Sequence, residues 1–349
     1  MSTIIERPGS RYEGGQMTRR DLFLSLSAMA LAPARVMGQS RSSVLPIQVT
    51  SWSHSSFHPN VSNLMWYQRV FGMPIMYHQA QPGTGGWPIL KVGDGPSYLG
   101  VGYVGPFRPA REPLVSHHFS MGIRNFNLDR IMRALSEMGV KEGGTGLRDM
   151  QHVGTPEPGF VDLDGNRPQF MDESCCGGGG YLGDLCDYSA KAIRLPGDPP
   201  PIAVQTLNHC KIGVRNLQRT IAWYQKLTDM KLVTYQELEG GPRTAGYEGG
   251  PVAILQFGAG PQHLALTEGI VRPHFGFGIK GFDVSQIMKR LAEHGVPARV
   301  RMREGVTPEV LLEDPEGLEL QLQDVSYCGG GGVLGNVCDP RQRPFPGSV

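Results

Sequence analysis

The chain carries the same set of motifs twice in the same order, and this repetition restricts it to a duplicated architecture. Three matches in one order, at nearly one spacing, indicate that the second half of the sequence is an internal copy of the first. Every functional residue can therefore be compared with its counterpart in the other copy. The repeated motifs are Trp-Tyr-Gln at residues 66–68 and 223–225, His-Phe at 118–119 and 274–275, and Cys-Gly-Gly-Gly-Gly at 176–180 and 328–332.

The composition excludes nucleic-acid binding as a function. The 349 residues suffice for two domains, and 40% hydrophobic with 19% charged residues is typical of a globular protein. The formal net charge is only +1, without a run of lysine and arginine residues. Because a nucleic-acid-binding surface needs a basic surplus to neutralise phosphates, we expect a small-molecule substrate as the partner and no nucleic acid.

Residues 1–39 differ from the rest and resemble a twin-arginine (Tat) export signal. Arg19 and Arg20 precede an apolar stretch over residues 22–32, and small residues follow. That stretch is too short to span a bilayer as a helix, and the order of charged, apolar and small segments is typical of a signal peptide. We expect an exported, periplasmic protein without a membrane anchor after signal removal. The alternative is an accidental arginine pair before a disordered arm.

The remaining sequence divides into two copies joined by a stiff connector. We expect a first domain over residues 46–187, a proline-rich linker over 188–201 and a second domain over 202–339. Within each copy the order strand–helix–strand–strand–strand occurs twice, with helix N-caps at Asn216 and Asp283 in the second copy. The predicted fold class is therefore α+β, with four βαβββ modules paired into two domains. Each pair forms a cupped mixed sheet with its helices outside, and the cup is a natural ligand site.

Five segments of the second copy carry a resemblance to a known superfamily. They are Leu-Asn-His at residues 207–209, Ile-Ala-Trp-Tyr at 221–224, His-Phe-Gly-Phe at 274–277, His-Gly-Val at 294–296 and Asp-Pro-Glu-Gly at 314–317. In these motifs the chain resembles the vicinal oxygen chelate (VOC) superfamily of glyoxalases, bleomycin-resistance proteins and extradiol dioxygenases. Four modules in two domains look most like the extradiol branch.

The resemblance implies a metal-dependent, dioxygenase-like enzyme. Its substrate would be a small oxygen-rich or aromatic molecule, chelated at one divalent metal in the second domain. The alternatives are a non-catalytic small-molecule-binding protein of the resistance type and a glyoxalase-like isomerase or lyase. A structural or assembly role for the Cys-Gly loops is a further alternative, and homo-oligomer formation stays open.

The resemblance also implies which residues hold the metal. One ligand comes from the first strand of each module of the second domain and one from its last strand, which gives His209, His274 and Gln321. Two imidazoles and one oxygen leave coordination positions open for a substrate with adjacent oxygen atoms. The family carries Glu where this chain has Gln321, so Glu319, on the same strand face, is the alternative ligand. Iron or manganese is the expected metal, with zinc or nickel as alternatives.

A third histidine, His263, resembles the acid–base histidine of extradiol enzymes and is the predicted catalytic residue. Its counterpart in the first copy is Tyr98, which cannot move protons in the same way near neutral pH. The family's extradiol members also carry a His and a Tyr shortly before the Asp-Pro turn. This chain has Leu311 at the Tyr position and no His between Arg299 and Leu312, so ordinary catechol cleavage is not expected.

The first copy retains only part of the predicted metal site. His118 and Gln169 match the second histidine and the glutamine, while alignment on the helices places Trp52 opposite His209, with His54 two residues further on. We therefore interpret His54, His118 and Gln169 as the counterparts of the ligands in a degenerate first domain. The second domain is the predicted working half.

The cysteines form a separate pattern around the glycine-rich turns. In an exported protein, two pairs that are each ten residues apart are compatible with two small loop-closing disulfides, and a soft-metal site is the alternative. The two left-over cysteines include one, next to His209, that strand alternation points to the opposite face. The candidate pairs are Cys176 with Cys186 and Cys328 with Cys338, and the left-over residues are Cys175 and Cys210.

Overall fold

The computed structural model describes most of the chain beyond residue 43, and Val44–Val349 forms one compact unit. The predicted signal peptide and most of the predicted linker lie outside the described residues. Within the described part of the chain, no helix is both long and apolar enough to cross a membrane. The described residues are 44–57, 61–79, 87–101, 118–141, 148–152, 154–184, 186, 196, 199–236, 251–269, 274–303 and 306–338.

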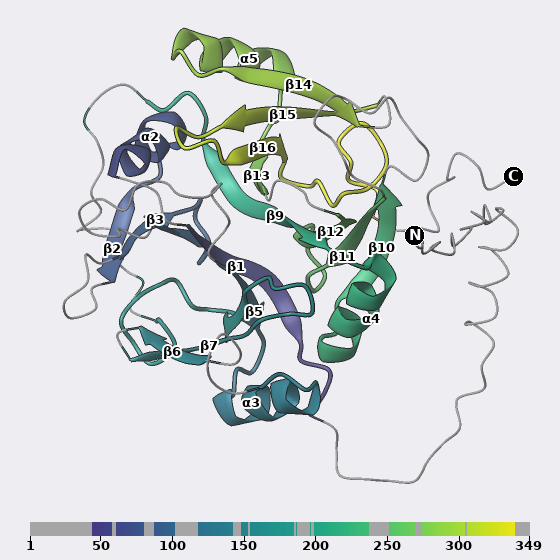
Figure 1. The fold of residues 1–349 in the computed structure, drawn as a ribbon. Helices are drawn as coiled ribbons and strands as arrows, with labels where there is room; N and C mark the ends of the chain where they lie inside the picture. The colour runs from purple at the N-terminus through teal and green to yellow at the C-terminus, as the bar shows by residue number, and fades with distance from the viewer. Residues whose placement is uncertain are drawn as a thin grey trace, which may run out of the picture. The chain divides into compact units, whose positions relative to one another are not determined.

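The described residues of the first half form one eight-stranded mixed sheet and two helices (Figure 1). The elements are β1 (Val49–Phe57), α2 (Val61–Phe71), β2 (Ile75–Gln79), β3 (Trp87–Lys91), β4 (Tyr98–Val101), β5 (His118–Ile123), α3 (Leu128–Glu137), β6 (Arg148–His152), β7 (Thr155–Gly159) and β8 (Pro168–Asp172). The strand order is β2-β3-β4-β1-β5-β8-β7-β6. At its centre β1 pairs in parallel with β4 and antiparallel with β5.

The second half repeats this sheet with the same topology. Its elements are β9 (Val204–Val214), α4 (Leu217–Leu227), β10 (Lys231–Gln236), β11 (Val252–Gln256), β12 (His263–Glu268), β13 (His274–Ile279), α5 (Val284–Glu293), β14 (Ala298–Arg303), β15 (Thr307–Glu313) and β16 (Glu319–Asp324). The strand order is β10-β11-β12-β9-β13-β16-β15-β14. The predicted α+β class with four βαβββ modules is therefore confirmed, while the exact domain boundaries stay a prediction.

The helices of the second half begin where the sequence indicates. Asn216 and Asp283 precede α4 and α5, and their side-chain oxygens accept hydrogen bonds from the backbone N–H groups of Arg219 and Gln286, both at 2.9 Å. Each bond satisfies one of the N–H groups that a helix start leaves without an intrahelical partner. Both predicted N-caps are confirmed.

One hydrophobic core continues through both halves. The strands β1 and β9 lie side by side where the two sheets meet (Figure 1). Across this junction the rings of Trp52 and Phe275 lie 5.7 Å apart, and those of Phe71 and Phe277 lie 5.3 Å apart. Each half therefore buries part of its apolar surface against the other half.

Two buried tyrosine–aspartate hydrogen bonds also join the halves, and they are reciprocal. Tyr67 on α2 donates to Asp314 in the turn before β16, with 3.2 Å between oxygens. Tyr224 on α4 donates to Asp162 in the turn before β8, at 2.8 Å. Burial raises the pKa of both aspartates. These Tyr–Asp contacts, which link each half's first helix to the other half's last turn, recur because the sequence is duplicated.

Both predicted cysteine pairs lie at disulfide distance. The Cα atoms of Cys176 and Cys186 are 5.6 Å apart, and those of Cys328 and Cys338 are 5.7 Å apart. Cys210 is fully buried in the hydrophobic core, on the side of β9 away from His209, as its alternation indicates. Burial raises the pKa of the Cys175 thiol to about 12, so this thiol stays protonated and unreactive at neutral pH.

Candidate functional site

Three buried histidines lie on neighbouring strands of the second sheet. His209 on β9 is in parallel register with His263 on β12 and in antiparallel register with Gly276 on β13, while His274 lies two residues before that glycine. Because alternate residues of a strand share a face, all three side chains point to the same side of the sheet. None of the three is more than 3% exposed. The structure thus brings together the three histidines that the sequence singled out.

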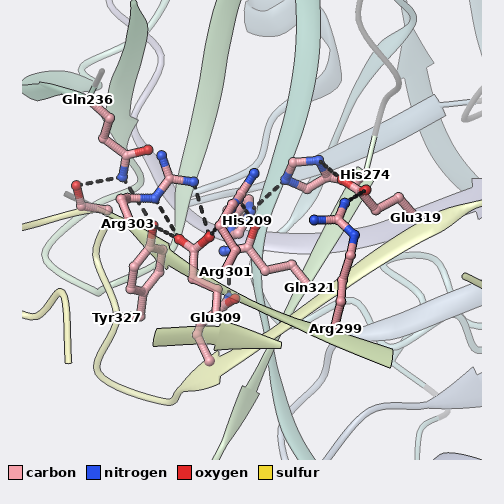
Figure 2. Close-up of polar contacts among 12 residues, drawn as sticks. His209, Gln236, His274, Arg299, Arg301, Arg303, Glu309, Glu319, Gln321 and Tyr327 are labelled. Carbon is pink, nitrogen blue, oxygen red and sulfur yellow. Dashed lines mark hydrogen bonds and ion pairs between the residues drawn. The ribbon is translucent and has the colours of Figure 1, made fainter. Parts of the chain in front are cut away.

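The rings of His209 and His274 meet through their Nε2 atoms, which lie 3.2 Å apart (Figure 2). The ring of His263 stacks on that of His209, with centroids 4.8 Å apart and an angle of 12° between the planes. The stacked ring packs against one face of His209 and restricts the plane of that ring.

Hydrogen bonds to the other ring nitrogens determine which tautomers are present. The Nδ2 of Asn208 donates to the carbonyl of Tyr327 at 2.6 Å, so its Oδ1 faces the Nδ1 of His209 at 3.0 Å and accepts a proton from it. The Nδ1 of His274 lies 3.3 Å from a carboxylate oxygen of Glu319 and donates to it. With both Nδ1 atoms protonated, the two Nε2 atoms present lone pairs to each other. A cation, either a proton or a metal ion, is needed between them.

The separation of the two Nε2 atoms suits a shared metal ion. Imidazole nitrogens bind divalent transition metals at about 2.0–2.1 Å, so two of them on one metal lie about 2.9–3.4 Å apart, depending on geometry. Burial lowers the pKa of His209 well below its usual value and that of His274 to about 4. Both imidazoles are therefore neutral at pH 7, which is the form that binds metals.

A glycine makes room for the His209 ring. A Cβ atom at Gly276 would lie 2.2 Å from Nδ1 of His209 and 2.6 Å from Nε2 of Gln323. That distance is far below van der Waals contact, so a side chain at this position requires the His209 ring or the backbone to shift. The amide nitrogen of Gln323 lies 3.3 Å from Nδ1 of His209. Because both atoms carry protons in this tautomer, the approach is a packing contact and not a hydrogen bond.

The two predicted oxygen ligands have different environments. Gln321 is fully buried beside Gly276, its Oε1 accepts a hydrogen bond from Arg301 at 3.1 Å, and its Nε2 has no hydrogen-bond partner among the described residues. Glu319 instead accepts from His274 and pairs with Arg299 at 3.0 Å. Burial would raise the pKa of Glu319, but His274 and the arginines outweigh it and hold the pKa at about 2. Glu319 therefore orients His274, and Gln321 is the oxygen donor in register with the histidines.

The donor set fits a metal through two imidazoles and an amide oxygen. Within the described ranges, no group of three or more His, Cys, Asp or Glu side chains is placed to hold a metal ion. The carboxylates nearby are occupied by cationic partners. A divalent ion would therefore be bound by neutral ligands and would need an anionic co-ligand to balance its charge.

A buried charged cluster lies beside the histidines, and sequence reasoning missed it. Glu309 on β15 accepts from Arg303 at 2.5 Å and from Arg301 at 2.6 Å, and the hydroxyl of Tyr327 donates to it at 2.9 Å (Figure 2). Burial would raise the pKa of Glu309, but the two arginines outweigh it and lower the pKa to about 2. The alternation of Arg299, Arg301 and Arg303 along one strand places all three on one face, which was the available signal.

The first half contains a matching pair of histidines. His54 is in register with Tyr98 on β4 and with Ser120 on β5, which are the positions of His263 and Gly276 in the second half. The Nε2 atoms of His54 and His118 lie 3.1 Å apart, and Tyr98 stacks on His54 with ring centroids 4.4 Å apart.

The strand register corrects the alignment made on the helices. The counterpart of His209 is His54, whereas Trp52 is fully buried in the core against Phe275. The two copies differ in the length of the connection between this strand and the helix that follows. An alignment anchored on the helix motif therefore shifts the strand by two residues. The β-bulge between Trp52 and His54 turns Trp52 to the core face of the sheet, opposite to the face of His54.

The comparisons with known proteins agree with the strand topology. Residues 206–322 match the family model of the Glyoxalase/Bleomycin resistance protein/Dioxygenase superfamily. The second half of the chain therefore resembles this superfamily. The match falls in the second half, and the first half of the chain has the same strand order. A comparison with curated protein sequences gives no match.

Solved structures share the fold across both halves. A catechol 2,3-dioxygenase has a TM-score of 0.55 and 12% identity over 79% of this chain and 88% of that chain. Homoprotocatechuate 2,3-dioxygenase from Arthrobacter globiformis has a TM-score of 0.56 and 14% identity, covering 80% of each chain. The Mn(II)-bound glyoxalase from Novosphingobium aromaticivorans has a TM-score of 0.53 and 11% identity, covering 79% and 82%. At such identities the likeness shows the fold alone.

Proposed function

We propose that this protein is a metal-dependent, dioxygenase-like enzyme of the VOC superfamily that binds a small oxygen-rich or aromatic molecule in its second half. His209, His274 and the amide oxygen of Gln321 would hold the metal, with iron or manganese favoured. The observation that carries the proposal is the 3.2 Å separation of the two Nε2 atoms, with each Nδ1 atom facing a side-chain oxygen of Asn208 or Glu319. A bound divalent metal orients and polarises the oxygen atoms of a chelated molecule.

His263 would accept a proton from the bound molecule. Its Nδ1 donates to the carbonyl of Pro261 at 3.0 Å, so its Nε2 carries the lone pair. Burial lowers its pKa to about 4, and the ring is neutral at pH 7. A hydroxyl group of the substrate would transfer its proton to this Nε2 and become an oxyanion, which is the better chelating form.

Cationic side chains around the histidines would stabilise this oxyanion. Lys211, which is buried, and Arg301, whose side chain is 20% exposed, both contribute to the lowered pKa values of the histidines. An anionic oxygen bound here is attracted by these charges, and burial makes the attraction stronger than it would be in water. The site therefore favours a substrate that ionises on binding.

Metal analysis of the purified full-length protein tests the proposal. We expect transition metal to be bound, and the His274→Ala variant to lose the metal held in the second half. His294→Ala, at an exposed position after α5, is the matched control and should keep it. A wild-type protein that holds less than about one tenth of an equivalent of any transition metal, and cannot be loaded with iron or manganese, would refute the proposal.

Two observations support a non-catalytic binding protein as the second candidate. Arg301 occupies the oxygen of Gln321, and buried Leu311 stands where extradiol relatives have a Tyr. An oxygen electrode separates the candidates when a catechol panel is incubated with metal-loaded protein. A dioxygenase consumes oxygen, an isomerase or lyase yields product without oxygen uptake, and a binding protein returns the catechol unchanged.

Export through the Tat pathway is part of the proposal and has its own test. Residues 1–43 fused to a folded reporter should direct it to the periplasm, and changing both Arg19 and Arg20 to Lys should retain it in the cytoplasm. A reporter that is never exported would refute this part without bearing on the metal site.

A further inference from the structure

The histidine pair of the first half has the geometry of the pair in the second half. His54 and His118 are 2% and 7% exposed, and their Nε2 atoms are separated by 3.1 Å, against 3.2 Å for His209 and His274. Both distances fall in the range of about 2.9–3.4 Å expected for two imidazole nitrogens on one metal ion. The interpretation of the first half as degenerate therefore does not follow from its histidines.

Two buried oxygen-bearing side chains lie on the same face as this pair. Gln169 on β8 is in parallel register with Ser120 on β5, which itself pairs with His54. Gln169 is 1% exposed and Ser120 is fully buried. Neither polar atom of Gln169, nor the hydroxyl of Ser120, has a hydrogen-bond partner among the described residues. In the second half, by contrast, Arg301 occupies the oxygen of Gln321.

Buried polar atoms without partners are costly, so their presence needs a reason. A cation held by the histidines would give the Gln169 oxygen a partner. The amide oxygen and the two Nε2 atoms then form the same donor set that the second half offers, without a guanidinium on the oxygen. Hard oxygen and imidazole nitrogen together suit divalent first-row transition metals.

The charges around the two pairs differ in a way that favours a cation in the first half. The strand register shows which first-half residues stand at the cationic positions of the second half. Ser56 replaces Lys211, Met150 replaces Arg301, and His152 replaces Arg303. The position of Glu309 keeps its carboxylate as Glu157, which is 2% exposed. Three cationic positions are thus replaced by residues without a fixed positive charge, and the buried acid remains. The position of Glu319 is held by Arg167, which is exposed to solvent. Repulsion of a divalent ion is correspondingly weaker.

We infer that the first half holds a divalent transition-metal ion of its own, bound by His54, His118 and the amide oxygen of Gln169. This site is separate from the one proposed for the second half. Its role is to bind a metal within the first half, and no substrate is assigned to it.

Metal stoichiometry of full-length variants tests the inference. Metal-free protein is titrated with Co(II), whose absorption reports imidazole ligation, and bound cobalt is measured by elemental analysis. We expect wild-type protein to bind one ion in each half, His118→Ala to lose one of them, and His274→Ala to lose the other. If His118→Ala binds as much cobalt as wild type, the inference is refuted. If His274→Ala binds as much cobalt as wild type while His118→Ala loses one ion, the second-half proposal fails and the first-half inference stands.

A second variant guards against loss of folding in His118→Ala. Gln169→Glu supplies a carboxylate in place of the amide oxygen, so it should tighten cobalt binding in the first half by about tenfold or more. A glutamine that serves only the packing of β8 would instead give a less stable protein with unchanged or weaker cobalt binding. That outcome would overturn the assignment of Gln169 as a ligand.

Discussion

We predict that removing the charge of the buried Glu309 carboxylate lowers the free energy of unfolding. Glu309→Gln keeps the shape of the side chain but removes the charge that two arginines share. The pKa of Glu309 is held at about 2, against an ordinary value of 4.5. At about 1.4 kcal/mol per pH unit, this difference corresponds to roughly 3 kcal/mol of unfolding free energy. Breaking one partner of a buried ion pair costs about 3–5 kcal/mol, which agrees with that figure.

The pH dependence follows from the direction of the shift. Since the pKa of Glu309 is lower in the folded than in the unfolded protein, its contribution is fully present above pH 4.5 and is lost as the pH falls toward 2. Urea unfolding of wild type and Glu309→Gln should therefore differ by about 3 kcal/mol near pH 7, and the difference should shrink steadily in acid. The native disulfide pairs are kept oxidised throughout.

Glu293→Gln is the matched control for this experiment. Glu293 is 55% exposed and lies 3.9 Å from Lys289 one helical turn away, so its loss should cost less than about 0.5 kcal/mol. A Glu309→Gln variant that loses no more stability than this control would refute the reasoning. A loss that stays constant from neutral pH down to about pH 2.5 would show that the cost is one of packing and not of charge.

Other parts of the structure give three further predictions. Gly276→Ala should displace the His209 ring, destabilise the protein by about 1–3 kcal/mol and weaken metal binding in the second half, as measured by unfolding and cobalt titration. Cys328→Ser should lower the unfolding free energy by roughly 2–3 kcal/mol under oxidising conditions, and by far less once wild type is reduced. Tyr224→Phe should cost about 1–3 kcal/mol, because Asp162 stays buried with one hydrogen bond fewer.

The fold was accessible from the sequence because its signals are local and repeated. The motif order and the helix N-caps at Asn216 and Asp283 predict four modules, and the strand topology confirms them. His209, His263 and His274 could be placed on one face because their strands neighbour one another in each module pair. The alternation of side chains along the strands and the duplication of the motifs were together sufficient to predict the fold and the position of these histidines.

The rest depends on distances that a sequence pattern does not contain. The sequence around Gln321 does not indicate that Arg301 donates a hydrogen bond to its oxygen. The two residues come together only because β15 pairs with both β14 and β16 in the folded sheet. The matching of His54 with His209 failed in the sequence alignment for a related reason. A connection of different length moved the strand relative to the helix, and only the register across the sheet restores the match.

The reciprocal Tyr–Asp contacts have a consequence for symmetry. The second half contains both members of the contact, Tyr224 and Asp314, yet within the chain each is satisfied by the other half. Two copies of the second half related by a twofold axis could satisfy both at once, so the chain is built as a covalently fused dimer. A fragment of residues 202–338 should accordingly self-associate. The first half then serves as the packing partner that the second half needs, independently of any metal that it binds.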